Sequence, residues 1–129
     1  MPKRFRVVAA GSSLLTQPVG DGWIAAGDAA AAHDPLSSLG IGSALAGGRV
    51  AARAVAATLD GDVSARGAYI EQLRSDYARY LWERHAYYAD ERRWSSMPFW
   101  ERRHANGQAH STQILETAAT TFCPSELIP

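Results

Sequence analysis

The stretch GWIAAGDAAAAHDPLSSLGIGSALAGG, from Gly22 to Gly48, decides the expected fold of this chain. Its first apolar run, Trp23 to Ala26, predicts a buried strand that ends in a loop at Gly27 and Asp28. Small residues dominate the rest of the stretch, where ordinary core packing would favour Leu and Phe. We therefore expect the backbone of this stretch to lie very close to a neighbouring group.

A helix is predicted immediately after this loop, from about Ile41 to Leu59. The segment has no proline and few β-branched residues, and Asp60 and Gly61 supply a stop signal. Small side chains in its first turns would let the helix approach its neighbours closely, although tight packing of a helix on a sheet demands the same composition without any ligand. These small residues are Ser43, Ala44, Ala46, Gly47, Gly48, Ala51 and Ala52.

Short strands are predicted before the decisive stretch. Phe5 to Ala10 is apolar and partly β-branched, and Ser12 to Leu15 continues it as a second edge segment. Turn signals follow at Pro18, Gly20 and Gly22. The basic residues at the N-terminus imitate a secretory signal, but the apolar run after them is too short, so a strand is favoured.

A second, longer helix is predicted from about Ser64 to Trp94, with Ser64 as its cap. Aromatic and aliphatic residues recur every three or four positions, which places them on one helical face, and charged residues form the solvated face. The first face contains Tyr69, Leu73, Tyr77, Leu81, Arg84 and Tyr88, and the second contains Glu71, Arg74, Arg79, Glu83 and Arg92.

The segment Met97 to Trp100 is expected to break this helix, and a short helical piece from Glu101 to Asn106 to follow it. Residues 107–129 form a polar tail with two prolines as breakers. Trp94 and the aromatic pair in Met97 to Trp100 are packing anchors or, alternatively, line a substrate entrance.

Composition restricts the partners and the setting of the chain. Its 129 residues, 47% hydrophobic and 20% charged, suit one modest soluble domain. With 13 basic and 13 acidic residues, no overall charge favours nucleic acid or a membrane surface, and no apolar run is long enough to span a bilayer. The single cysteine, Cys123, allows no internal disulfide, so a cytoplasmic location is expected.

The predicted fold class is an α+β fragment that is mostly α, with short β segments followed by two long helices. The strands are too few for a complete sheet, and no Gly-x-Gly-x-x-Gly unit is present. The strand at Trp23 to Ala26 is thus expected to lack partners within the chain. We divide the sequence into residues 1–26 (strands), 27–60 (loop and helix), 61–106 (helical region) and 107–129 (tail).

The loop and the first helix carry groups suited to a flat, partly negative ligand. A carboxylate at Asp28 can accept hydrogen bonds from vicinal hydroxyls, as acidic residues do with the ribose of a nucleotide, and Gly27 allows close backbone approach. Gly40-Ile41-Gly42 opens the helix and presents unpaired amides and the positive end of its dipole. Asp28, His33 and Asp34 do not have the spacing of a metal site, and His33 is read as a polar loop residue.

These residues resemble a known family. Gly27-Asp28-Ala29-Ala30, Asp34-Pro35-Leu36 and Gly40-Ile41 look like the second FAD-binding fingerprint of class A flavoprotein monooxygenases and flavin-dependent halogenases. YYADERRWSSMPFWERR, from Tyr87 to Arg103, resembles the tail of a halogenase-like branch that includes maturation hydroxylases. The resemblance covers residues 7–104 and implies the C-terminal part of a Rossmann-like, p-hydroxybenzoate hydroxylase-like fold without its N-terminal dinucleotide unit.

The resemblance also implies the roles of single residues toward FAD. Asp28, beside Gly27, would bind a ribitol or ribose hydroxyl, and Pro35 would lie beside the isoalloxazine. The backbone of Gly40-Ile41-Gly42 would contact the flavin pyrimidine edge, and Leu39 is counted among the cofactor-binding residues. A helix N-terminus aimed there would favour the reduced flavin by about 1 to 2 kcal/mol, which corresponds to a few tens of millivolts.

The implied function is hydroxylation of an aromatic or peptidyl substrate through a flavin hydroperoxide, with FAD as the cofactor and no metal. The missing FAD-binding half would come from an N-terminal portion or a partner chain. Leu39 stands where halogenases usually have a hydroxyl residue that helps to hold halide, and Lys3, the sole lysine, does not occupy the place of their catalytic lysine. A halogenase fragment and a non-catalytic helical interaction module remain as alternatives.

Overall fold

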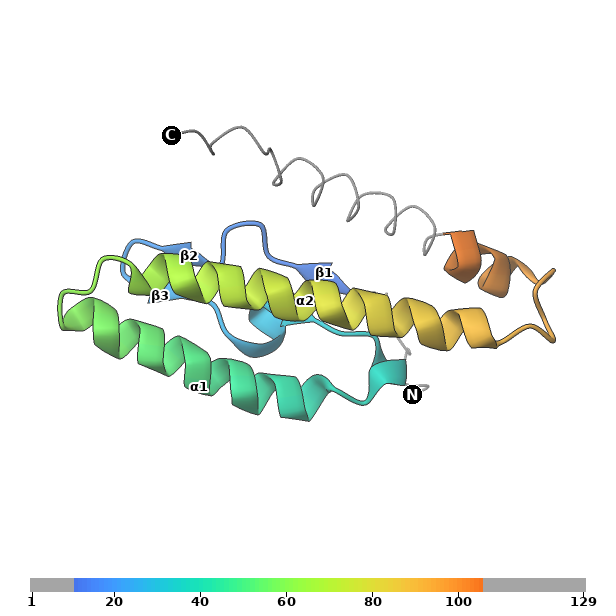
Figure 1. Cartoon of the computed structure of the whole chain (residues 1–129), viewed down its shortest axis with the longest axis horizontal. Coiled ribbons are helices and arrows are strands. Elements are labelled where there is room, and N and C mark those ends of the chain that lie inside the picture. The colour runs from blue at the N-terminus through green and yellow to red at the C-terminus, as the bar shows by residue number, and fades with distance from the viewer. Residues whose placement is uncertain (1–10, 106–129) are drawn as a thin grey trace, which may run out of the picture. The chain divides into compact units, whose positions relative to one another are not determined.

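The computed structural model describes residues 11–105, and the chain divides into two compact units, Met1–Arg79 and Tyr80–Pro129. The predicted strand from Phe5 to Ala10, Cys123 and the tail lie outside the described residues. The element order is two pairs of short strands with two 3-10 turns, followed by two long helices (Figure 1). None of the helices within residues 11–105 has the length and apolarity required to cross a membrane.

A hairpin in the first unit corrects the prediction for Trp23 to Ala26. β2 (Val19–Gly20) pairs antiparallel with β3 (Trp23–Ile24), so β3 does have a partner within the chain. Trp23 is 49% exposed, so the strand is not buried as expected. The reason is the two-residue turn between β2 and β3, in which Gly22 adopts φ 72° and the chain reverses at the surface.

A second strand pair closes the segment that leads to the first helix. β1 (Ser13–Leu14) pairs antiparallel with β4 (Ala31–Ala32), and the Leu15 amide donates to the Ala30 carbonyl at 2.8 Å. β1 confirms the predicted strand at Ser12 to Leu15. Between the two pairs lies the 3-10 turn η1 (Gly27–Ala29), and η2 (Pro35–Ser37) follows β4.

α1 (Gly40–Leu59) confirms the predicted first helix to within one residue at its start. α2 (Ala65–Asp90) confirms the second helix, but it ends four residues before Trp94. The Ser64 hydroxyl donates to the Asp62 carboxylate at 2.6 Å, and the Ser64 amide donates to the same oxygen at 2.8 Å. Both bonds lower the pKa of Asp62 and make it the residue that organises the connection between the helices.

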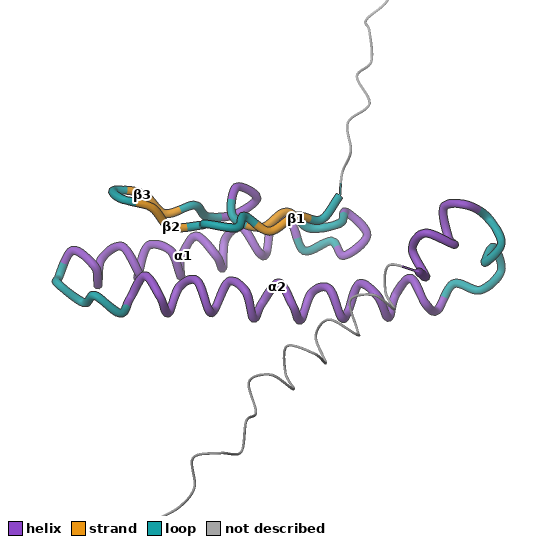
Figure 2. The backbone as a smooth tube through the Cα atoms, turned by 90° about the horizontal axis from the view of Figure 1, so that it is seen from above, coloured by secondary structure: helices purple, strands orange, loops and turns teal. Residues whose placement is uncertain are grey.

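In the first unit, the strand pairs cover one side of the layer formed by α1 and the first half of α2 (Figure 2). Val19, Ala51, Ala54 and Tyr69 form the core cluster there. Tyr69 is 4% exposed, and its hydroxyl donates to the Ala25 carbonyl at 2.6 Å. Leu73 and Tyr77 on the same helical face are half-buried, whereas Glu71, Arg74 and Arg79 are exposed, as the spacing predicted.

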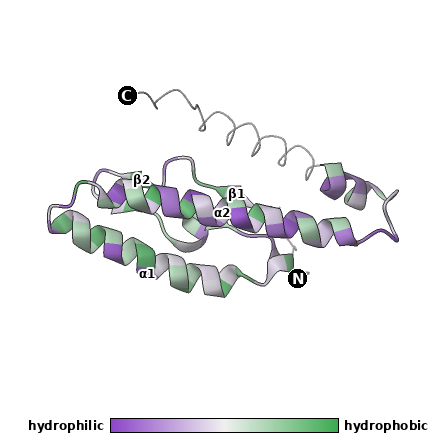
Figure 3. Cartoon of the chain, in the orientation of Figure 1, coloured by the Kyte–Doolittle hydropathy of each residue, from purple (hydrophilic) through white to green (hydrophobic). Residues whose placement is uncertain are grey.

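The buried hydrophobic residues of the described part are mostly alanines and tyrosines. They are Val19, three tyrosines and five alanines (Ala30, Ala31, Ala51, Ala54 and Ala65), and no side chain within residues 11–105 is fully buried. Larger apolar residues such as Leu45 and Leu59 are instead on the surface, and apolar colour runs along α1 (Figure 3). The described part of the chain therefore leaves much of its apolar area uncovered.

The second unit contains the end of α2 and a helical segment at residues 98–105. This segment begins at Pro98, so the break lies at residues 91–97 and not at Met97 to Trp100. Proline suits the first turn of a helix, where its missing N–H has no intrahelical acceptor. Tyr88 makes edge contacts with Phe99 and Trp100, with ring centroids 6.4 and 5.9 Å apart.

Cation and ring contacts fix the same segment. The Arg103 guanidinium lies 4.8 Å from the centroids of the Tyr88 and Phe99 rings, and the Arg84 guanidinium lies 5.4 Å from the Tyr88 ring. His104 Nε2 is 2.9 Å from the Tyr88 carbonyl. Phe99 and Trp100 thus pack within their own unit, which favours the packing role, whereas Trp94 is 55% exposed.

Candidate functional site

The 3-10 turn η1 packs directly against α1, and Gly27 and Gly47 lie at the contact. A Cβ atom added to Gly27 would lie 3.6 Å from the Ala44 Cβ, and one added to Gly47 would lie 4.0 Å from the Gly27 nitrogen. Gly27 also adopts φ 58°, a conformation that other residues rarely take. The small residues of the decisive stretch are therefore explained in part by packing between η1 and α1.

Asp28 follows Gly27 and is exposed. Its neighbour Gly27 meets α1 at Ala44, which lies one helical turn, about 6 Å along the axis, from Gly40. η1 therefore carries Asp28 at the N-terminal part of α1. A carboxylate in this position is open to a ligand that contacts the start of the helix.

The first turn of α1 offers backbone donors. The N-cap residue is Leu39, and no side chain caps the helix. The first intrahelical bond runs from the Ser43 amide to the Leu39 carbonyl at 2.8 Å, so the amides of Gly40, Ile41 and Gly42 precede the helical ladder. All three residues are exposed. Together with the helix dipole, these amides suit an electron-rich edge of a ligand.

The loop between β4 and α1 is held by its own hydrogen bonds. Asp34 is 6% exposed, and its Oδ1 accepts from the Leu36 amide at 3.0 Å while its carbonyl accepts from the Ser37 hydroxyl at 2.8 Å. The Ser37 hydroxyl in turn accepts from the Leu39 amide at 3.3 Å. Asp34 therefore has a structural role, because its hydrogen bonds hold the loop that leads into α1. Pro35 and Leu39 in this loop are exposed.

His33 lies next to this loop and contacts α2. Its ring centroid is 6.2 Å from that of Tyr77. His33 therefore packs against an aromatic ring of α2 and is not only a polar loop residue. No group of three or more His, Cys, Asp or Glu side chains that could hold a metal ion occurs in the part of the chain that the structure describes.

A pocket of about 210 Å³ lies at the other end of α1, and sequence reasoning did not find it. Val55 and Leu59 of α1, Trp23 of the hairpin and Arg66 of α2 line it. Arg66 donates to the Gly20 carbonyl. Val55 is 15 residues, about 22 Å along the helix, from Gly40, so this pocket is not the predicted flavin site. The residues that line the pocket are far apart in the sequence and come together only in the folded chain, so no local sequence pattern predicts the pocket.

Comparison with known proteins finds a relative that matches this chain over part of its own length. Over 103 residues, 77% of this chain, the sequence is 38% identical to a protein of Marinomonas mediterranea named "Putative FAD-dependent oxidoreductase LodB". The chain spans 26% of the length of that relative. No protein-family model matches the chain, and no solved structure matches it.

Proposed function

We propose that this chain contributes part of the FAD site of an FAD-dependent oxidoreductase. The observation that carries the proposal is the packing of η1, with Asp28, against the N-terminal turns of α1, whose first amides no side chain caps. The similarity to a relative that is named as an FAD-dependent oxidoreductase supports the same cofactor. The proposed site combines a hydroxyl-binding carboxylate with a helix N-terminus.

The residues in this region fit the cofactor chemically. Gly27 and Gly47 keep the backbone of η1 close to α1, which leaves Asp28 exposed beside the helix. The Asp28 carboxylate would accept hydrogen bonds from ribityl or ribose hydroxyls, and the amides of Gly40, Ile41 and Gly42 would donate to the flavin pyrimidine edge. When bound, FAD would supply two-electron redox chemistry, which none of these side chains can provide.

At a finer level, we propose a monooxygenase that hydroxylates an aromatic or peptidyl substrate. The support is the order of the fingerprint residues from Gly27 to Gly42. Leu39 at the N-cap offers no hydroxyl to a halide, which favours hydroxylation over halogenation. In this proposal the role of the chain is to bind and orient the cofactor and to stabilise negative charge on it.

Reconstitution tests the proposed cofactor. The full chain is co-expressed with the part of the Marinomonas relative that lies outside the matched residues, and retained FAD is measured by flavin absorbance. We expect FAD in the wild-type complex and about tenfold weaker FAD binding with Asp28→Asn, because one hydrogen-bonded carboxylate contributes about 1.5 kcal/mol. Asp21→Asn, in the exposed hairpin turn, is the matched control and should bind FAD normally. A complex whose Asp28→Asn form binds FAD as well as the control would contradict the proposed site.

A further inference from the structure

A second apolar face runs along the outside of α1. Ile41, Leu45, Val55 and Leu59 are 80%, 73%, 41% and 81% exposed. With Gly48 and Ala52 they follow one another at alternating steps of four and three residues, the spacing that brings side chains onto one narrow helical stripe. We call Ile41, Leu45, Gly48, Ala52, Val55 and Leu59 the outer stripe.

The outer stripe is distinct from the face that builds the core. Ala51 and Ala54, which belong to the core cluster, are 6% and 8% exposed. At 3.6 residues per turn, they lie about 80° and about 140° around α1 from the centre of the stripe. A solvent-facing helix surface normally carries charged and polar residues, whereas the stripe carries none. Four large apolar side chains in one uncovered row are therefore the signature of an interface.

The geometry of the stripe fits another helix. Alternating steps of four and three residues produce the near-parallel packing in which side chains of one helix enter gaps on the other. At its centre, Gly48 has no atom within 4 Å of an added Cβ and Ala52 is exposed, so a partner backbone can approach closely there. At its end, Val55 and Leu59 border the pocket with Trp23, which has room for an apolar side chain of the partner.

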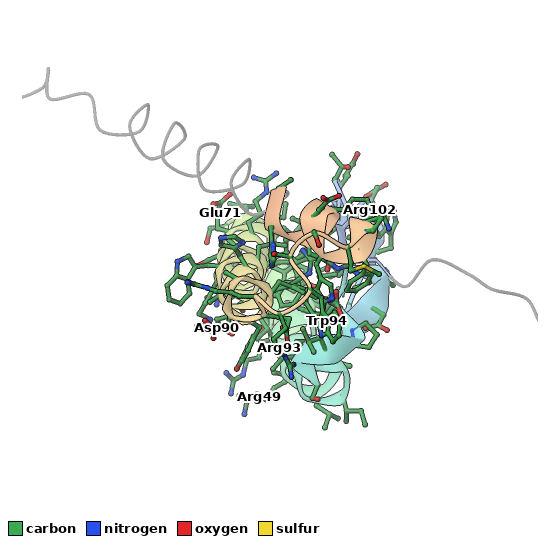
Figure 4. The ribbon with its side chains drawn as sticks, turned by 90° about the vertical axis from the view of Figure 1, so that its right-hand side faces the viewer. Arg49, Glu71, Asp90, Arg93, Trp94 and Arg102 are labelled. Carbon is green, nitrogen blue, oxygen red and sulfur yellow. The ribbon has the colours of Figure 1, made fainter. Side chains whose placement is uncertain are left out.

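Charge argues against a second copy of the same chain. α1 carries Arg49 and Arg53 beside the stripe and no acidic residue between Gly40 and Leu59. Arg49 extends away from the helix (Figure 4). If two copies met antiparallel at Gly48 and Ala52, the two Arg49 side chains would lie on the same flank and repel each other. In either orientation, α1 offers no carboxylate to pair with Arg49. The fitting partner is a different helix with an apolar row and acidic residues at its flank.

The small residues also argue against a membrane surface. Helices that lie on a bilayer insert bulky apolar side chains along the whole apolar face. The middle of the outer stripe is Gly48 and Ala52, which provide little area to insert but permit close contact with a helix.

We infer that the outer stripe docks an amphipathic helix, acidic at its flank, of the polypeptide that supplies the rest of the flavoprotein. The identity of this partner rests on the proposed function. The length of the relative supports it, because this chain spans 26% of that protein. The docked helix would cover the exposed row that the described residues leave bare.

Two glycine variants of the full chain test the interface. Gly48→Leu fills the centre of the stripe, and Gly67→Leu in α2 is the matched control, since neither glycine has a neighbour within 4 Å of an added Cβ. Each variant is titrated with the unmatched part of the Marinomonas relative, and binding is measured by calorimetry with and without FAD. Circular dichroism should show both variants folded.

We expect Gly48→Leu to weaken binding at least about tenfold, because overfilling a packed contact costs on the order of a factor of ten or more. Gly67→Leu should bind like the wild type. Exchanging Arg49 and Arg53 for Glu should weaken binding and reverse its salt dependence.

The outcomes separate the two proposals. If a complex forms without FAD and Gly48→Leu disrupts it, the result supports the inferred interface but contradicts the proposed function. If no complex forms, the inferred interface is overturned. It is also overturned if an FAD-loaded complex forms and the Gly48→Leu variant binds as tightly as the wild type. Self-association or binding to anionic phosphatidylserine vesicles that Gly48→Leu abolishes would overturn the inferred partner.

Discussion

Asp34 shows how one buried carboxylate positions the loop in front of α1. Its Oδ1 accepts from the Leu36 amide, and its backbone carbonyl accepts from the Ser37 hydroxyl, which itself accepts from the Leu39 amide. This chain of bonds ends at the N-cap of α1. At the residue scale, the loop is therefore set by hydrogen bonds that the pattern of residue types does not reveal.

Removing the Asp34 side chain should destabilise the fold. We expect Asp34→Ala to lower the free energy of unfolding by about 1 kcal/mol, because the Leu36 amide loses its acceptor. Asp34→Asn keeps an acceptor oxygen and should lose less than half of that amount. Urea denaturation measures both. Equal losses for the two variants would show that the charge of Asp34, and not the cap, is what stabilises the loop.

Tyr69 gives a prediction for alkaline pH. Burial raises the pKa of its phenol above the ordinary value of 10.0, so the unfolded chain loses this proton at lower pH than the folded chain. The stabilisation is present below about pH 10 and is lost as pH rises through the folded pKa. We expect the free energy of unfolding to fall as the pH rises above about 10.

Two phenylalanine variants isolate the Tyr69 contribution. Tyr69→Phe also removes the bond to the Ala25 carbonyl, so it should cost about 1 kcal/mol at neutral pH and show a smaller alkaline loss. Tyr87→Phe, at a residue that is 64% exposed, should behave like the wild type in both respects. An alkaline loss of equal size in Tyr69→Phe would mean that another group is responsible.

At the scale of elements, two neighbouring glycines of α1 have different surroundings. Gly47 faces η1, with the Gly27 nitrogen 4.0 Å from an added Cβ, whereas Gly48, one residue later, faces open space. The same helix therefore uses small residues for two different purposes on two faces. Composition alone cannot distinguish them.

A leucine at each position should have opposite effects in the isolated chain. Gly47→Leu should lower the free energy of unfolding by about 1 to 3 kcal/mol, because the longer side chain meets the backbone of η1. Gly48→Leu should be neutral or stabilising, because leucine favours helix more than glycine does. Thermal denaturation compares them. Equal stability of the two variants would show that η1 does not pack on α1 as described.

At the scale of the whole molecule, residues 11–105 bury few large side chains and expose many. The buried hydrophobic residues of the described part are mainly alanines and tyrosines, while Ile41, Leu45, Leu59 and Val63 are more than 70% exposed. We expect such residues to be covered when the inferred partner helix is bound.

The isolated chain should accordingly bind FAD weakly or not at all. Its proposed groups would contact only the flavin and the sugar hydroxyls, and the sequence has no Gly-x-Gly-x-x-Gly unit for the pyrophosphate. Fluorescence quenching of FAD during titration with the purified chain measures the affinity. Tight stoichiometric binding would show that this portion carries the affinity by itself.

The sequence by itself determined the helices and the order of the fingerprint residues. α1 and the apolar face of α2 follow from local propensity and from a spacing of three and four residues, which act between near neighbours in the chain. The sequence pattern placed Pro98 in a helix break, whereas the structure shows that it begins a helical segment. Proline is found both where helices are interrupted and in their first turn, so its presence alone does not distinguish the two.

Only the tertiary structure decided which faces are covered. The pairing of β2 with β3, the contact of Gly27 with α1 and the pocket beneath Trp23 join residues that local patterns treat separately. The sequence does not distinguish the two apolar faces of α1, because periodicity shows that a face is apolar but not which element packs against it. The core lies on one of them because the hairpin packs there, and that choice left the outer stripe uncovered.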